Sequence, residues 1–94
     1  MKSLVWGSSF RRALKRIVRR HPELREQIEQ SLRRLATDPF MPVLRTHKLK
    51  GELSSTWACT VEYDCRIVFE FVKSPVTGEE EILLIDIGTH DEVY

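Results

Sequence analysis

Ile82-Leu-Leu-Ile-Asp-Ile-Gly-Thr-His-Asp-Glu-Val-Tyr94 is the stretch of the chain from which the fold is most readily predicted. Its first six residues are largely apolar and end before Gly88, a pattern typical of a central β-strand. His90 follows two residues beyond Gly88, where a side chain is well held and still reached by solvent. Because imidazole exchanges protons near neutral pH, we expect a catalytic site at this end of the sheet.

The chain length predicts one small domain over residues 1–94, since 94 residues are enough to bury a core without a metal or disulfide. Charge is split between the halves. Residues 1–50 hold 13 Lys and Arg against 4 Asp and Glu, and residues 51–94 hold 2 against 10. This split is typical either of a basic surface that binds an anionic partner or of a solvated helix face balanced by acidic turns.

The sequence argues against a membrane span, a signal peptide, a disulfide, a metal site and a cofactor. No apolar run approaches the roughly 18 residues of a membrane span, and the N-terminus lacks the apolar segment of a signal peptide, so we expect a cytoplasmic protein without a membrane partner. With a two-residue turn at 63–64, Glu62 would lie opposite Cys65 and Cys59 opposite Val68, which argues against a disulfide. We expect both cysteines to be packing residues, and we expect no metal and no cofactor.

Two helices are predicted in the basic half, after a short strand at 4–6. Apolar residues at offsets 0, 4, 7 and 8 from Phe10 indicate a helix to Arg20, with Ser8 or Ser9 as its N-cap. Apolar residues at offsets 0, 4, 8 and 11 from Leu24 indicate a second helix, which Pro22 begins and Asp38-Pro39 ends.

The acidic half predicts strands joined by short connections. They are expected at 46–50, 56–63, 66–72 and 81–87. The prediction is therefore an α+β fold of two layers, a helical hairpin packed on one face of a mainly antiparallel sheet of four to five strands. The order is strand, helix, helix and then four strands. We expect the other face of the sheet, which carries Thr60, Glu62, Arg66 and Glu70, to be open to solvent or to a ligand.

Five polar residues are candidates for catalysis at the strand ends and on the open face: His47, Asp64, Arg66, His90 and Tyr94. RNA cleavage by its own 2′-hydroxyl needs one group to take a proton, one to give a proton and fixed positive charge at the phosphate. Histidine or carboxylate can carry the protons, arginine can bind the phosphate, and tyrosine can stack on a base. Each residue also has a structural alternative, as a surface His, a turn Asp or a Tyr that covers the core.

Four segments resemble the RelE superfamily of toxins from bacterial type II toxin–antitoxin modules, and most closely its YafQ-like branch. They are 47–51 (HKLKG), Trp57, 61–69 (VEYDCRIVF) and 87–94 (IGTHDEVY). The resemblance implies a RelE-like fold and a ribosome-dependent mRNA endoribonuclease that a cognate antitoxin neutralises. It implies functional roles for His47, Asp64, His90 and Tyr94, with Arg66 at the phosphate.

The chain departs from the YafQ-like pattern at Ala58 and Thr60, where those toxins carry an acid and a His, so one proton-transfer group is missing. Contacts to mRNA and ribosomal RNA are expected from basic residues on the first helix and near His47: Arg12, Arg16, Arg45, Lys48 and Lys50. Two alternatives of the same fold remain, a ParE-like gyrase inhibitor that does not cut RNA and a degenerate toxin that only binds its antitoxin.

Overall fold

The computed structural model describes residues 1–50, 55–62 and 64–89. Within these residues the chain forms five strands, two helices and two short 3₁₀ turns. In order they are β1 (Leu4–Trp6), α1 (Ser8–Arg20), η1 (Pro22–Leu24), α2 (Arg25–Thr37), η2 (Pro42–Leu44), β2 (His47–Lys48), β3 (Trp57–Glu62), β4 (Cys65–Lys73) and β5 (Glu80–Thr89). The predicted order of elements is confirmed.

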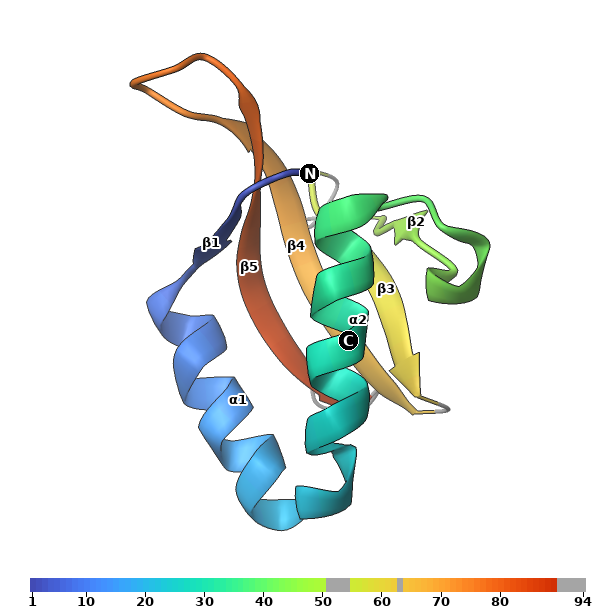
Figure 1. Ribbon diagram of the computed structural model, residues 1–94. Helices are drawn as coiled ribbons and strands as arrows, with labels where there is room; N and C mark the ends of the chain where they lie inside the picture. The colour runs from blue at the N-terminus through green and yellow to red at the C-terminus, as the bar shows by residue number, and fades with distance from the viewer. Residues whose placement is uncertain (51–54, 63, 90–94) are drawn as a thin grey trace.

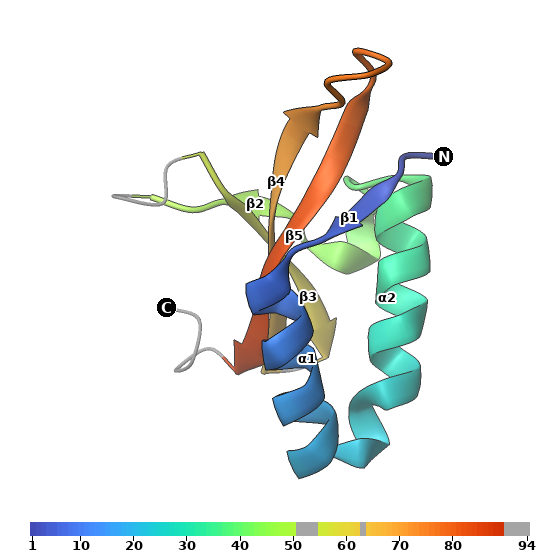
Figure 2. The ribbon, with the colours of Figure 1, turned by 90° about the vertical axis from the view of Figure 1, so that its left-hand side faces the viewer.

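The strands form one sheet in the order β1-β5-β4-β3-β2. β2 to β5 pair as an antiparallel meander, as their short connections require, whereas β1 pairs with β5 in parallel. Both helices cover the same face of this sheet, α1 against β5 and α2 against β3 (Figures 1 and 2). The predicted two-layer α+β fold is thus confirmed.

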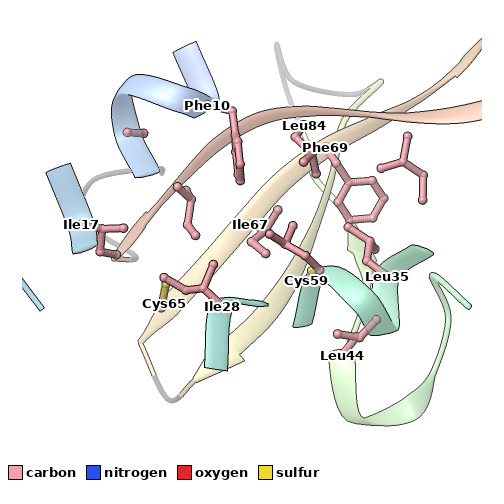
Figure 3. Packing of buried hydrophobic residues seen from close by; sticks show 14 residues of the cluster. Phe10, Ile17, Ile28, Leu35, Leu44, Cys59, Cys65, Ile67, Phe69 and Leu84 are labelled. Carbon is pink, nitrogen blue, oxygen red and sulfur yellow. The ribbon is translucent and has the colours of Figure 1, made fainter. Parts of the chain in front are cut away.

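The core lies between the helices and the sheet, as the two apolar stripes predict. Phe10 and Ile17 of α1 and Leu35 of α2 are buried against Ile67 and Leu84 of the central strands (Figure 3). Cys59 and Cys65 are buried as free thiols, as predicted. No helix in the described part of the chain is long and apolar enough to cross a membrane.

The start of α1 differs from the prediction, since neither serine caps it. Gly7 is the N-cap and gives no side-chain hydrogen bond, and the Ser9 hydroxyl donates instead to the Ile85 carbonyl at 2.8 Å. The Gly7 amide also donates to the Leu84 carbonyl at 3.2 Å, so the chain crosses β5 at close range. Ser8 and Ser9 lie within α1 rather than at the N-cap position, so the Ser9 hydroxyl ties the helix to β5 instead of capping it.

Most strand boundaries differ from the prediction by one or two residues, and the larger differences are in β5, β2 and the second helix. β5 continues through Gly88 to Thr89, because the whole of β4 from Cys65 to Lys73 pairs with it. β2 is limited to two residues, which is shorter than the predicted strand at 46–50. The second helix starts as the 3₁₀ turn η1 at Pro22, and its α-helical part begins at Arg25.

The β3–β4 hairpin has a different register from the one expected. Glu62 lies opposite Cys65 as predicted, but Cys59 lies opposite Ile67 rather than Val68. The register shifts between Thr60 and Glu62, where β3 has one extra residue. This bulge brings Cys59 and Ile67, which both face the core, onto the same face of the hairpin.

Candidate functional site

The face of the sheet opposite the helices is partly covered, rather than fully open as expected. Leu49 packs over Ala58 and Val68, and all three are buried, with Ile85 beside them. The Leu49 amide donates to the Thr56 carbonyl at 3.0 Å, which holds the segment after β2 across the strands. The part of this face nearer the β3–β4 turn is accessible around Thr60 and Arg66.

A depression of about 500 Å³ lies in this accessible part, and we call it the His47 depression. Its lining residues are Val43, Arg45, His47, Thr60, Glu62 and Arg66. Three of the site residues predicted from sequence, Arg45, His47 and Arg66, therefore come together from segments about 20 residues apart. One imidazole and two guanidinium groups line a surface large enough for part of a nucleotide.

Arg66 is positioned by the β3–β4 hairpin. It lies directly opposite Thr60 on β3 and Gly88 on β5, so Arg66 and Thr60 share one face of the sheet. Its Nη1 donates to the backbone carbonyls of Glu62 and Cys65, both at 3.4 Å. These hydrogen bonds are long, so a phosphate oxygen could replace them at little cost.

His47 is positioned by β2 and by the turn before it. Arg45 has a left-handed backbone conformation, with φ 51° and ψ 42°, which ends η2 and directs the chain into β2. His47 then pairs with Ala58, and its Nδ1 lies 3.1 Å from the Arg45 carbonyl. Because a carbonyl only accepts, Nδ1 carries hydrogen in this contact, and the hydrogen bond fixes the orientation of the ring.

The other predicted residues that the structure describes are not among those lining the His47 depression. Asp64 lines a separate hollow of about 230 Å³ with His21 and Thr89. Lys48 and Lys50 are exposed on either side of Leu49, and Arg12 and Arg16 are exposed on α1, which lies on the helical face of the sheet. His90 and Tyr94 lie outside the described residues.

Thr60 and Glu62 were given no catalytic role from sequence, yet both line the His47 depression. The strict alternation in 56–62 already placed Thr60 on the same face as Arg66, and that was the available signal. Within residues 1–50, 55–62 and 64–89, no three His, Cys, Asp or Glu side chains gather as a metal site.

Comparison with known proteins identifies a family and several structures of the same fold. A family model described as "Bacterial toxin of type II toxin-antitoxin system, YafQ" matches residues 2–94. The crystal structure of YafQ from E. coli strain BL21(DE3) matches with a TM-score of 0.80 at 14% identity, covering 100% of this chain and 99% of that chain. A comparison with curated proteins found no match.

Two further structures are similar to this chain. The E. coli DinJ-YafQ toxin-antitoxin complex matches with a TM-score of 0.78 at 16% identity, over 99% of this chain and 97% of that chain. A metal-bound toxin from Helicobacter pylori matches with a TM-score of 0.78 at 25% identity, over the whole of both chains. The shared two-layer fold thus extends over the full chain.

Proposed function

The chain belongs to the YafQ family of toxins from bacterial type II toxin–antitoxin systems, and from that premise we propose that it is an mRNA endoribonuclease. The His47 depression carries the proposal, because it holds an imidazole together with the guanidinium groups of Arg45 and Arg66. A proton carrier and fixed positive charge are what cleavage of a phosphodiester requires when no metal takes part.

The proposed reaction is an internal transesterification. The 2′-oxygen bonds to phosphorus, the bond from phosphorus to the 5′-oxygen breaks, and the products are a 2′,3′-cyclic phosphate and a 5′-hydroxyl. One group accepts the 2′ proton and another gives a proton to the departing 5′-oxygen. His47 performs one of these transfers through Nε2, and His90 in the tail is the second predicted proton carrier. Arg66 and Arg45 stabilise the charge on the phosphate.

We further propose that the enzyme acts on mRNA bound to the ribosome in the cytoplasm. Lys48 and Lys50 flank Leu49 beside the depression and would contact RNA phosphates there. Arg12 and Arg16 on α1 would contact ribosomal RNA. Tyr94 would stack on a base, and Asp64 would orient a neighbouring group from its separate hollow.

The proposed protein partner is a cognate antitoxin that neutralises the toxin. α1 carries basic residues along its length and no acidic residue in its first turn, so an acidic segment is the expected binder. The E. coli relative forms a toxin-antitoxin complex with DinJ, which supports a partner of this kind.

The decisive experiment maps cut positions on a defined mRNA, with and without ribosomes, in buffer containing EDTA. The expected result is cleavage that requires ribosomes, persists in EDTA and leaves a 2′,3′-cyclic phosphate. A single 2′-deoxy substitution at the cut nucleotide should abolish cleavage there, because it removes the nucleophile. Cleavage that survives the 2′-deoxy substitution would contradict the proposed mechanism.

The same preparation is tested for inhibition of DNA supercoiling by gyrase. Inhibition without any RNA cleavage would instead establish the ParE-like alternative. Antitoxin binding with neither activity would establish the degenerate toxin.

A further inference from the structure

Thr60 lines the His47 depression between two chain segments. On one side it lies opposite Arg66 in the β3–β4 ladder. On the other side, the antiparallel pairing of His47 with Ala58 directs residues 43–47 along the outer edge of β3. Arg45, Arg66 and His47 therefore surround Thr60, and all four side chains line the same surface.

The Thr60 side chain is half-buried. Threonine hydroxyls elsewhere in the described chain are used within the fold, as where Thr37 donates to the Arg33 carbonyl at 2.9 Å. Thr60 forms no such hydrogen bond with the described residues. A half-buried hydroxyl that shares its surface with the guanidinium groups of Arg45 and Arg66 is suited to donate to an anion, since neither guanidinium can accept its hydrogen.

We propose that Thr60 binds the scissile phosphodiester directly, donating its hydroxyl hydrogen to a non-bridging phosphate oxygen between Arg45 and Arg66. This inference rests on the proposed ribonuclease function and names the group that holds its substrate in place. The position of Thr60 on a paired strand gives the contact a rigid support, whereas the long arginine side chains adjust to the bound phosphate.

The proposal assigns Thr60 a different task from that of His47. Thr60 neither gains nor loses a proton in the reaction, and it stabilises negative charge that grows on the phosphate oxygens as the 2′-oxygen attacks. A hydrogen bond to a charged group is stronger than one between neutral groups. Loss of the hydroxyl should therefore weaken both substrate binding and cleavage.

Two conservative variants at position 60 test the contact. Thr60→Val keeps the branched shape and removes the hydroxyl, and Thr60→Ser keeps the hydroxyl and removes the methyl group. We expect Thr60→Val to slow single-turnover cleavage about 10- to 100-fold, the range for a hydrogen bond to a charged group, and Thr60→Ser to stay within about 3-fold of the parent. Equal thermal unfolding of the variants would show that the fold is intact.

Phosphorothioate substrates separate direct contact from an indirect effect. Sulfur at one non-bridging position accepts a hydrogen bond poorly, so one diastereomer should slow the parent and Thr60→Ser much more than it slows Thr60→Val. Cleavage by Thr60→Val at the parent rate, or an identical sulfur effect in both enzymes, would overturn the proposal.

Binding of a 2′-O-methyl oligoribonucleotide, which cannot be cleaved by this route, provides a second measurement by fluorescence anisotropy. We expect Thr60→Val to bind about 10-fold more weakly than the parent and Thr60→Ser to bind nearly as tightly. If the parent binds but does not cleave RNA, a weaker Thr60→Val complex would support the phosphate contact while the nuclease function fails. Equal binding by the parent and Thr60→Val would overturn the contact in either case.

Discussion

The imidazole of His47 is held by the backbone of Arg45, whose carbonyl oxygen lies 3.1 Å from Nδ1. The contact joins two residues that line the same depression, and it depends on the left-handed conformation of Arg45. The hydrogen bond engages Nδ1 and fixes the orientation of the ring. His47 is thus oriented by the fold itself, which lowers the cost of reaching a reactive geometry.

Replacement of His47 by Gln should slow mRNA cleavage about 100-fold or more, since a positioned proton carrier contributes about that much. His21→Gln is the matched control, because His21 is exposed and contacts Glu23 at 3.4 Å outside the His47 depression. Single-turnover cleavage on ribosomes measures both variants. An unchanged rate for His47→Gln would exclude His47 from proton transfer.

The contribution of Arg66 to the cleavage rate should depend on the shape of its side chain as well as on its charge. Arg66→Lys keeps one positive charge but loses the planar group that can give two parallel hydrogen bonds to a phosphate. We expect Arg66→Lys to cleave about 10-fold more slowly than the parent and Arg66→Ala about 100-fold more slowly, in the range for charge stabilisation of a transition state. Arg33→Ala, on the outer surface of α2, is the control. Equal rates for Arg66→Lys and the parent would show that charge alone suffices.

The basic surface of α1 should make antitoxin binding strongly dependent on salt. Ionic screening weakens attraction between exposed charges, so the affinity should fall steeply from low to high salt. Replacing Arg12 and Arg16 together with Ser should reduce that dependence, measured by titration calorimetry at several salt concentrations. An affinity that is constant across salt concentrations would argue against α1 as the contact.

Replacing Gly7 by alanine, which adds only a methyl group, should destabilise the fold. A Cβ at this position would lie 2.6 Å from the Leu84 carbonyl oxygen, a backbone atom that cannot move without disturbing β5. We expect Gly7→Ala to lower stability by about 1–3 kcal/mol and the Tm by several degrees. The neighbouring Ser8→Ala is the control, since Ser8 is exposed and makes no cap. If Gly7→Ala has the same Tm as the parent, the backbone at position 7 can move away from the Leu84 carbonyl, and the prediction is wrong.

The Cys59 thiol should make the fold sensitive to alkali. Burial, and then the neighbouring Cys65, raise the pKa of Cys59 from 9.0 to about 12. The folded state therefore favours the neutral thiol, and the stability that this gives is present below pH 9 and is lost between pH 9 and about 12. Thermal unfolding should show the Tm of the parent approaching that of Cys59→Ala as the pH rises through this range. If the difference in Tm between the parent and Cys59→Ala stays constant with pH, the raised pKa of Cys59 is contradicted.

Much of the fold follows from local patterns in the sequence. The stripes that begin at Phe10 and Leu24 predicted both helices, because a period near 3.6 leaves one face for the core. The alternation around Cys59 predicted the hairpin faces, because side chains of a strand alternate. Such patterns decide which residues face inward, and these were the confirmed parts of the prediction.

Pairing between distant segments could not be predicted in the same way. The extra residue between Thr60 and Glu62 shifts the hairpin register, and no turn residue marks it. Leu49 covers Ala58 and Val68 from outside the strands, which depends on the path of the chain rather than on periodicity. The gathering of His47 and Arg66 was expected from their chemistry, whereas the place of Thr60 directly opposite Arg66 depends on the register of the hairpin.

The parallel pairing of β1 with β5 joins residues 4–6 to residues 82–84, and nearly the full length of the described chain lies between them. During synthesis, α1 and α2 emerge first and cannot bury their apolar stripes until β4 and β5 have left the ribosomal exit tunnel. The sheet, and with it the core beneath both helices, is therefore completed only after nearly the whole chain has been synthesised.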